Sequence, residues 1–312
     1  MTTQDGVEFV FIAEAGILEA QAVLLCESIR RFAGNHASAP ITVVSPRSRR
    51  SPSQSAQRKL TQLGAEYLPL EIDSCCPDYG TSYRVHSLAA IERRPGPPVI
   101  VQLDSDTIFL GEPDFSTNCD LAARPVDMKG MCTAGDGDPL DGYWHKLCAL
   151  AGVDYEKLPF VETTVDGLSV RASYNGGLVA AKRGCGIFQR TEEVFRRLVA
   201  EKLMPWPAGP TVMTGTGLLG GAATVYWGTS QAAIAVAVVA GNHPVQLLPA
   251  TYNVPLHLID PMEVPQSAQW KHVHYHWLFS QAASGANPML CETFALPPET
   301  RDWLSSRLPL NY

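Results

Sequence analysis

Long hydrophobic runs are absent from this sequence of 312 residues. The longest apolar run without a charge covers residues 232–240, whereas a helix that crosses a bilayer needs about 20 apolar residues. Residues 1–6 contain an acidic side chain where a signal peptide carries positive charge, and Glu14 and Glu19 interrupt the apolar residues that follow. From these absences we expect no transmembrane segment and a cytoplasmic location.

Basic residues are also scarce, because 24 Lys and Arg stand against 31 Asp and Glu and give a net charge of -7. This balance argues against nucleic acid and against an anionic membrane as partners. None of the 8 cysteines stands in a CxxC pair, and Cys75 and Cys76 are adjacent, a poor geometry for a bridge between them. We interpret the cysteines as reduced thiols that mostly fill the core, and a metal role for one of them stays open.

Hydrophobic residues, by contrast, make up 46% of the chain, and they form short apolar runs that alternate with helical patterns. Up to residue 110, strand-like runs cover residues 7–13, 40–45 and 67–72, and helical spacing covers residues 16–32, 54–63 and 83–94. The alternation predicts an α/β fold with a mostly parallel central sheet flanked by helices. Beyond residue 110 we expect helices at 143–151, 191–202 and 231–240, and strands at 120–124 and 245–248.

An apolar run from Val99 to Leu103 ends directly before two carboxylates, Asp104 and Asp106. Turn residues precede the run, which is rich in Val, so we predict a buried strand. In open α/β sheets the ligand binds beyond the carboxyl ends of the strands, and neighbouring carboxylates repel unless a cation or a proton separates them. The pair therefore predicts a site for Mn²⁺ or Mg²⁺.

Three histidines alternate near the C-terminus, at His272, His274 and His276. On a strand all three would point to one face, a pattern that is typical of a zinc site but also of a polar sheet edge. Two aspartates with one imidazole would instead make a ligand set dominated by oxygen, which suits Mn²⁺ better than Zn²⁺.

Two further segments have more than one interpretation. Residues 46–50 are rich in arginine and follow a predicted strand, so they are either a solvated loop or a contact for phosphate. Residues 215–220 match the letters GxGxxG, but no clear strand precedes them and no acidic residue follows about 20 residues later. We interpret them as a flexible loop over the active site rather than a dinucleotide site.

The order of these motifs resembles the GT-A glycosyltransferases, and most closely glycosyltransferase family 8 and its retaining relatives, over roughly residues 7–280. The resemblance is carried by Tyr83-Arg84 at the start of a helix, residues 99–106, Tyr174-Asn175-Gly176-Gly177, Gln231, residues 248–253 and residues 273–275. It implies a GT-A (Rossmann-like) fold in one composite domain. Residues 1–110 would form the nucleotide-sugar-binding half, and residues 111–312 would form the acceptor-side half with the C-terminal metal histidine.

The resemblance also implies an activity and a set of site residues. The protein would be a hexosyltransferase-type enzyme that moves a sugar from a nucleotide-diphosphate sugar, most often a UDP-sugar, to a carbohydrate or other hydroxyl acceptor with the help of Mn²⁺ or Mg²⁺. The implied metal ligands are Asp104, Asp106 and His274. The implied donor-binding residues are Ala13, Val44, Ser45, Arg84, Asp104 and Ser105. Gln231 would lie by the anomeric carbon, and Asn175 would contact the transferred sugar or the acceptor.

The chain departs from the family pattern in two places. Ser230 precedes Gln231 where the family commonly has an aspartate, and residues 276–280 replace its closing Gly-x-x-Lys-Pro-Trp segment. Without a well-placed carboxylate nucleophile, a retaining enzyme can let the departing phosphate oxygen deprotonate the acceptor on the same face of the sugar. The family relationship thus favours retention of the anomeric configuration.

Other mechanisms and other classes of protein stay open. An inverting enzyme would need an Asp or Glu base, for which Asp136, Asp138 and Asp166 are the candidates, although we interpret these three as solvated loop residues. A zinc-dependent hydrolase would use the face of His272, His274 and His276, and a non-catalytic protein that binds a nucleotide sugar would account for Ser230.

Overall fold

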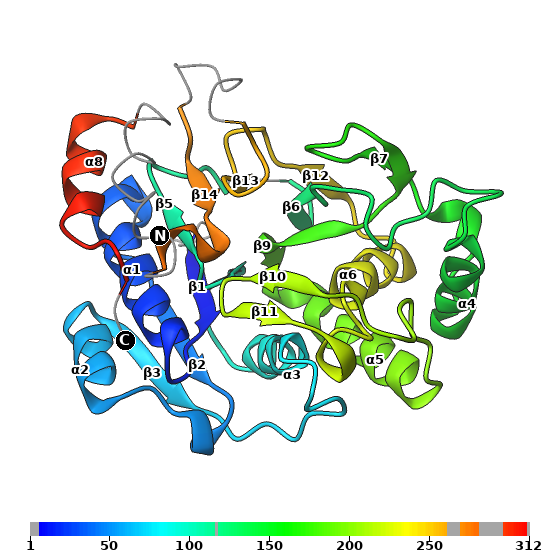
Figure 1. Ribbon diagram of the computed structural model, residues 1–312, viewed down its shortest axis with the longest axis horizontal. Helices are drawn as coiled ribbons and strands as arrows, with labels where there is room; N and C mark the ends of the chain where they lie inside the picture. Colours follow the sequence, from blue (N-terminus) through cyan, green and yellow to red (C-terminus); the bar gives the residue numbers. More distant parts are fainter. Residues whose placement is uncertain (1–5, 116–117, 261–268, 281–295, 311–312) are drawn as a thin grey trace.

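The computed structural model describes residues 6–115, 118–260, 269–280 and 296–310. In its first third, strands and helices alternate as the apolar pattern predicts, with shifts of a few residues at their ends (Figure 1). These elements are β1 (Val7–Ile12), α1 (Ile17–Phe32), η1 (Gly34–His36), β2 (Ile41–Ser45), η2 (Ser48–Arg50), α2 (Gln54–Gln62), β3 (Ala65–Pro69), α3 (Thr81–Glu92) and β4 (Val99–Leu103).

The rest of the chain is more mixed. It contains β5 (Thr107–Phe109), β6 (Leu121–Pro125), α4 (Asp141–Ala151), η3 (Tyr155–Lys157), β7 (Phe160–Glu162), β8 (Ser169–Arg171), β9 (Tyr174–Lys182), η4 (Arg183–Cys185) and α5 (Ile187–Ala200). Then follow β10 (Val212–Thr214), β11 (Gly217–Leu219), η5 (Gly221–Ala223), α6 (Thr229–Ala240), β12 (Val245–Leu247), β13 (Val254–Pro255), β14 (His272–His274), η6 (His276–Phe279) and α8 (Pro298–Ser305).

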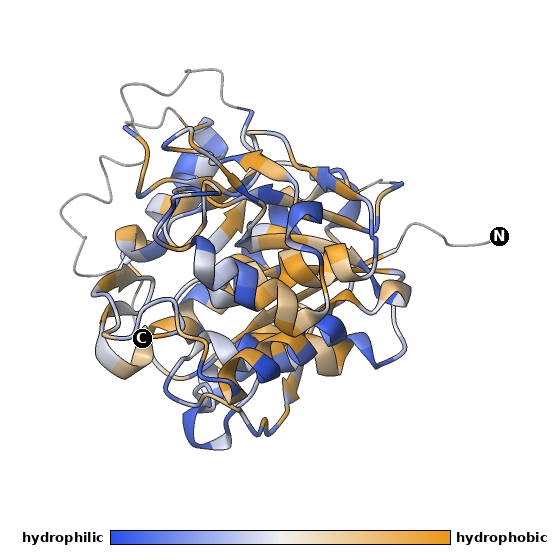
Figure 2. Ribbon diagram, turned by 90° about the vertical axis from the view of Figure 1, so that its right-hand side faces the viewer, coloured by the Kyte–Doolittle hydropathy of each residue, from blue (hydrophilic) through white to orange (hydrophobic). Residues whose placement is uncertain are grey.

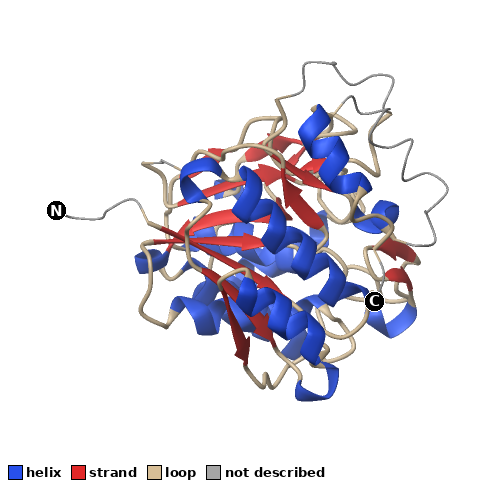
Figure 3. Cartoon of the chain, turned by 90° about the vertical axis from the view of Figure 1, so that its left-hand side faces the viewer, coloured by secondary structure: helices blue, strands red, loops and turns tan. Residues whose placement is uncertain are grey.

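Seven strands form the central sheet, in the order β12-β6-β9-β4-β1-β2-β3. The pairs β1–β2, β1–β4, β2–β3 and β6–β12 are parallel, whereas β9 runs antiparallel to both β4 and β6. Figure 3 shows these strands fanning out as a twisted sheet with helices packed against it. The predicted α/β class with a mostly parallel sheet is therefore confirmed.

Helices cover both faces of this sheet because successive side chains of a strand point to opposite sides. On β1, Phe9 and Phe11 belong to the core shared with α1 and α2, whereas Val10 belongs to the core shared with α3, α4, α5 and α6. Figure 2 shows hydrophobic residues concentrated on the strands and on helix faces turned toward them. Within the described residues, no helix is both long and apolar enough to cross a membrane.

A small second sheet positions the C-terminal histidines. Its order is β13-β14-β5, and β14 pairs antiparallel with β5 so that His274 lies opposite Thr107. The apolar run around residues 99–110 therefore forms two strands, β4 and β5, which belong to different sheets. The Asp104-Ser105-Asp106 segment is the turn between them, and both sheets hold it in place.

Candidate active site

A cavity of about 810 Å³ opens at the edge of the central sheet where β4 ends. Its walls come from segments on both sides of residue 110. They include the ends of β1 and β6, the starts of α1, α3 and α6, the loop after β2, the hairpin of β10 and β11, and residues around β14. This is the edge at which open α/β sheets bind their ligands.

The turn after β4 places Asp104 and Asp106 at the floor of the cavity. The backbone N–H of Asp104 donates to the carbonyl of Gly177 on β9 at 3.1 Å, and the Thr107 hydroxyl donates to the carbonyl of Asp104 at 2.7 Å. The guanidinium of Arg84 on α3 forms an ion pair with Asp104. Arg84, which the resemblance implies as a donor-binding residue, thus contacts one of the two aspartates.

His274 lies beside Asp106, although 168 residues separate them in the sequence. Its Nε2 is 3.2 Å from Oδ1 of Asp106, and the backbone N–H of Tyr275 donates to the Asp106 carbonyl at 3.0 Å. Burial would raise the pKa of Asp106, but the charge and hydrogen bond of His274 lower it. Burial would lower the pKa of His274, but the charge and hydrogen bond of Asp106 raise it. Each group therefore favours the charged form of the other.

The three histidines do not share one strand face, which corrects that expectation. Strand β14 ends at His274, and His276 begins η6 with a φ of 50°. Its ring still lies beside that of His274, with centroids 4.2 Å apart, whereas His272 packs against Phe109 with ring centroids at 4.8 Å. His272 is fully buried and does not border the cavity, so the face that a zinc hydrolase would need is not assembled.

One group of side chains can hold a metal ion at this floor. A ligand atom from each of Asp106, His274 and His276 lies within 4.8 Å of the others. The Nδ1 atoms of His274 and His276 are buried and have no hydrogen-bond partner among the described residues. One imidazole nitrogen from each histidine and one carboxylate oxygen form a donor set that suits a divalent transition metal.

The Tyr174-Asn175-Gly176-Gly177 run forms the start of β9, and neighbouring side chains leave room only for glycine at its last two positions. A Cβ on Gly176 would lie 2.6 Å from Nη2 of Arg84, and one on Gly177 would lie 2.2 Å from Oδ1 of Asn253 and 2.8 Å from Nδ1 of His274. Only glycine lets these side chains approach the strand so closely. The run therefore keeps room for Arg84 and His274 beside the aspartate turn.

Asn175 binds the carboxylate of Asp127, a cavity residue that we did not predict from the sequence. Oδ1 of Asn175 accepts the N–H of Gly177 at 2.9 Å, which turns its amide NH₂ toward Asp127, to which it donates. The Thr164 hydroxyl donates to the other carboxylate oxygen of Asp127 at 2.7 Å. Burial raises the pKa of Asp127, although Thr164 and the charge of His274 act in the opposite direction. Asp127 thus faces the cavity as a carboxylate with increased proton affinity.

Asp136, Asp138 and Asp166 do not border the cavity, so none of them is placed to be the base of an inverting enzyme, and all three lie in loops as we interpreted them. Asp138 pairs with Lys129 at 2.9 Å, and Asp166 accepts the backbone N–H of Lys129 at 3.0 Å. Asp127 carried a recognisable signal, since it follows the end of a buried strand as Asp104 does. No comparable sequence pattern indicated His257, whose ring lies tilted against that of His276 with the centroids 3.6 Å apart.

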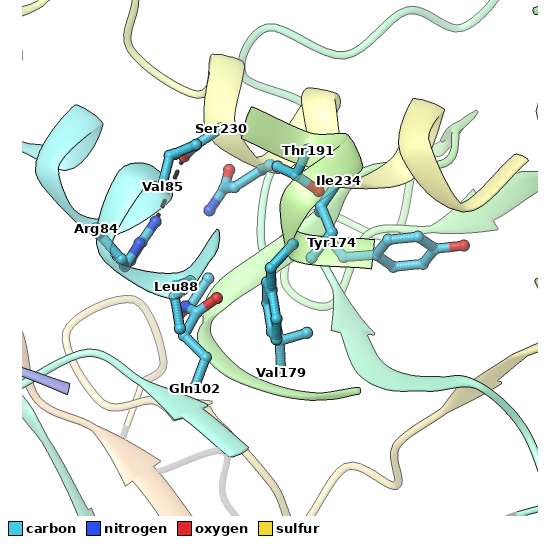
Figure 4. Close-up of a pocket in the computed structure, with 12 residues that line it drawn as sticks. Arg84, Val85, Leu88, Gln102, Tyr174, Val179, Thr191, Ser230 and Ile234 are labelled. Carbon is cyan, nitrogen blue, oxygen red and sulfur yellow. Dashed lines mark hydrogen bonds between the residues drawn. The ribbon is translucent and has the colours of Figure 1, made fainter. Parts of the chain in front are cut away.

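Helix α6 brings Ser230 and Gln231 to the cavity wall. Figure 4 shows Arg84 reaching from α3 toward Ser230, and its Nη2 donates to the Ser230 hydroxyl at 3.4 Å. The two side chains also border a small neighbouring cavity of about 20 Å³. Ser230 therefore contacts the same arginine that binds Asp104.

Three of the implied donor-binding residues do not contact the cavity, which corrects that expectation. Ala13, Val44 and Ser45 are buried and do not border the cavity; the N–H of Ala13 donates to the Val44 carbonyl at 3.0 Å inside the sheet. Their neighbours reach the cavity instead. Glu14 forms ion pairs with Arg47, and with Arg50 at 3.6 Å, and all three side chains border the cavity.

The segment matching GxGxxG covers the aspartates as part of a hairpin, not as a loop. Strands β10 and β11 pair antiparallel, and Gly215 lies at the turn between them. A Cβ on Gly215 would lie 2.3 Å from Oδ2 of Asp106, and the Gln21 amide donates to the Gly215 carbonyl at 3.1 Å. The hairpin turn therefore lies directly against Asp106.

Comparisons with known proteins identify the family. Among the curated proteins none matches this chain. A family model, however, matches residues 9–206, which include most of β1, all of β2 to β9, the aspartate turn, Asp127 and Asn175. Its description is Rhodobacterales glycosyltransferase domain. The match covers well over half of the chain, and the seven-stranded, mostly parallel sheet flanked by helices is the arrangement expected of a GT-A fold. The chain belongs to the Rhodobacterales glycosyltransferase domain family.

Proposed function

We propose that this glycosyltransferase is metal-dependent and transfers a hexose from a nucleotide-diphosphate sugar to a hydroxyl acceptor. The resemblance to family 8 favours a UDP-sugar as the donor. The observation that carries the proposal is the assembly of Asp104, Asp106 and His274 from two different sheets at the floor of one cavity. An ion pair that only stabilises the fold can form anywhere in the protein, whereas this group lies at the edge of the sheet where ligands bind.

The residues present fit Mn²⁺ or Mg²⁺. Asp106 and His274 would hold the ion, Asp104 would support it from its pair with Arg84, and His276 is a further nitrogen ligand within reach. One carboxylate with imidazoles favours Mn²⁺ over Mg²⁺, because Mg²⁺ prefers oxygen ligands. When bound, the ion would neutralise negative charge that builds on the departing diphosphate.

The donor would lie between the two halves of the chain. Residues 1–110 supply Arg47, Arg50 and Arg84, whose positive charges suit the phosphates, and residues 111–312 supply Asp127, Asn175 and Gln231. The arginines are held in place by Glu14 and Asp104, so the wall is already organised. A cavity of about 810 Å³ is in the range that small-molecule ligands fill.

The acceptor would enter on the side of Asp127 and Asn175. In the proposed retaining reaction, the bond from the anomeric carbon to the diphosphate oxygen breaks, and the acceptor oxygen forms the new bond on the same face. The acceptor proton passes to the departing phosphate oxygen. Asp127 would orient the acceptor hydroxyl by accepting its hydrogen bond, and Gln231 would face the reacting centre with its amide.

The decisive experiment is a thermal-shift screen of UDP, GDP, ADP and their sugars, each with and without Mn²⁺. We expect one diphosphate to raise the melting temperature only when Mn²⁺ is present, and EDTA to abolish the shift. The same ligand should leave Asp106→Asn unshifted. Failure of every diphosphate to stabilise the wild-type protein with Mn²⁺ would refute the proposal.

The steric course has its own test. Once a donor is identified, the anomeric configuration of the product can be read by NMR spectroscopy, and retention is expected. Asp127→Asn should give the same retained product, because the side-chain amide can still accept a hydrogen bond from the acceptor hydroxyl. The rate should fall roughly 10- to 100-fold, because an amide oxygen is a weaker acceptor than a carboxylate. If the wild-type protein instead gives an inverted product and Asp127→Asn is inactive, Asp127 is the base of an inverting enzyme.

A further inference from the structure

A second cluster of metal-ligating side chains lies at the opposite edge of the central sheet. Asp120 precedes β6, Cys185 ends η4 after β9, and His243 lies between α6 and β12. Lys182, at the end of β9, pairs with Val99 at the start of β4, so this edge is the one farthest from the turn of Asp104 and Asp106. None of the three side chains borders the donor cavity.

The three side chains converge on one point. A ligand atom from each of Asp120, Cys185 and His243 lies within 4.8 Å of the others, and Nδ1 of His243 is 2.9 Å from Oδ2 of Asp120. All three are half-buried. They come from positions far apart in the sequence, so tertiary structure alone brings them together.

The backbone holds this cluster in a defined position. The N–H of Asp120 donates to the Pro244 carbonyl at 3.0 Å, and the N–H of Lys182 donates to the Asp120 carbonyl at 2.9 Å. The His243 ring is seated over Gly241, since a Cβ at that position would lie 2.2 Å from its Nε2. Only a glycine at the end of α6 leaves this space. The imidazole is thus directed to Asp120 by its surroundings.

A thiol, an imidazole and one carboxylate form a ligand set typical of zinc. Zinc ligands lie about 2.0–2.3 Å from the metal, which puts tetrahedral ligand atoms about 3.5 Å apart, and the cluster needs only small side-chain shifts to reach this spacing. Because the cluster is half-exposed, water can supply the fourth ligand. We propose that Asp120, Cys185 and His243 form a Zn²⁺ site that joins the segments before β6, after β9 and before β12.

This site would select a different metal from the donor cavity. The thiol is a soft ligand that Mn²⁺ and Mg²⁺ do not prefer, whereas the candidate metal group of the cavity contains no sulfur. Without metal, the Lys182 ammonium is 3.2 Å from Oδ1 of Asp120 and supplies the positive charge. Its side chain is 38% exposed, so it can turn into solvent when zinc binds. Zinc would also displace the thiol proton of Cys185.

Cobalt substitution gives a direct readout of this site. Co²⁺ bound to a thiolate produces a charge-transfer absorption in the near ultraviolet, which a carboxylate–imidazole site does not. We expect the purified full-length protein, stripped of metal and titrated with Co²⁺, to show this band and to lose it when Zn²⁺ is added. The proposal is independent of the donor specificity, because no nucleotide or sugar enters the experiment.

Matched variants show which side chains produce the charge-transfer band. Cys185→Ser should abolish it, and His243→Gln should weaken zinc binding by at least about tenfold. Cys119→Ser, next to Asp120 in the sequence, and Cys132→Ser, at the donor cavity, should both leave it intact. Lys182→Gln should strengthen zinc binding, because it removes the competing cation. Melting temperatures of the metal-free proteins show whether each variant is folded.

Two results would overturn the proposal. One is a wild-type protein that shows no thiolate band with Co²⁺. The other is a band that survives in Cys185→Ser. If Cys185→Ser fails to fold, His243→Gln and Lys182→Gln decide instead, and an unchanged zinc affinity in both would overturn the proposal.

Discussion

Two polar clusters in this protein differ in how completely their groups are paired. Between α3 and α5, both carboxylate oxygens of Glu192 are engaged: one accepts from His86 at 2.9 Å and Arg196 at 3.1 Å, and the other from Arg93 at 2.8 Å. At the cavity floor, by contrast, the buried Nδ1 atoms of His274 and His276 have no hydrogen-bond partner among the described residues.

This difference separates a structural cluster from a ligand site. A buried polar group without a partner costs about 1–3 kcal/mol, so a folded protein retains such groups mainly where a ligand completes them. In the Glu192 cluster both carboxylate oxygens have partners within the protein, and these bonds link α3 to α5. The Asp106 cluster instead brings two imidazoles to one carboxylate at the wall of a cavity, as an ion-binding site requires. The following predictions test this distinction.

Asp106→Asn should have the largest effect on transfer activity. The substitution removes the charge that faces His274, and we expect the activity to fall on the order of 1,000-fold while the free energy of unfolding changes little. Steady-state rates with the donor found by the thermal-shift screen, together with urea unfolding, measure both. Glu192→Gln is the control with the reverse profile, and equal loss of activity in the two variants would erase the distinction.

Gly177→Ala should have the next largest effect. The new methyl group would lie 2.2 Å from Oδ1 of Asn253 and 2.8 Å from Nδ1 of His274, so one of these side chains must move. A displacement of this size at a reacting site costs on the order of 100-fold in rate. Gly142→Ala, where the added carbon meets nothing within 4 Å, serves as the control and should keep the wild-type rate constant kcat. A wild-type rate in Gly177→Ala would show that the position of His274 does not matter.

Glu192→Gln should act on stability instead. It leaves the arginines and His86 without their carboxylate, and we expect the free energy of unfolding to fall by about 2 kcal/mol. Arg93 and Arg196 are half-exposed and regain water, which keeps the loss below that of a fully buried pair. Urea unfolding measures the change, and kcat of the folded protein should stay within about twofold of the wild type.

The pH dependence of stability should be the smallest effect. Burial would raise the pKa of Glu192, but Arg93, His86 and Arg196 lower it, so its contribution is present above its ordinary pKa of 4.5 and is lost as the pH falls through its lowered value. Burial lowers the pKa of His86, so below about pH 6.5 the unfolded chain takes up a proton that the folded chain does not, and stability falls.

The two groups can be separated by their pH windows. In Glu192→Gln, the loss of stability between about pH 6.5 and 5 should persist because His86 stays buried, whereas the loss below about pH 4.5 should become smaller. Urea unfolding at a series of pH values measures both slopes. An unchanged slope below pH 4.5 would mean that Glu192 is not the titrating group.

Some features of the site were readable from the chain because local patterns determine them. The Val99 to Leu103 run is apolar and follows a turn, so it had to be a buried strand, and Asp104 and Asp106 had to follow its carboxyl end. The two glycines after Asn175 likewise stand in one short run. Their close approach to Arg84 and His274 is a three-dimensional fact, but the run itself was visible.

Other features depend on contacts between distant segments. The pairing of β14 with β5 decides that His274 and not His272 meets Asp106, because the register puts His274 opposite Thr107. The same applies to Asp127, which borders the cavity while Asn175 on another strand and Thr164 bind its two oxygens. No local periodicity contains this information.

The sequence by itself therefore determined the α/β alternation, the strand that ends in two aspartates and the motifs of a glycosyltransferase. The family resemblance had implied His274, but only the tertiary structure places its ring beside Asp106. Tertiary structure alone decided that Asp127 faces the cavity and that Ala13, Val44 and Ser45 do not border it. The physical reason is that apolar periodicity follows from neighbours along the chain, whereas a site depends on strand register and on side-chain contacts across more than 100 residues.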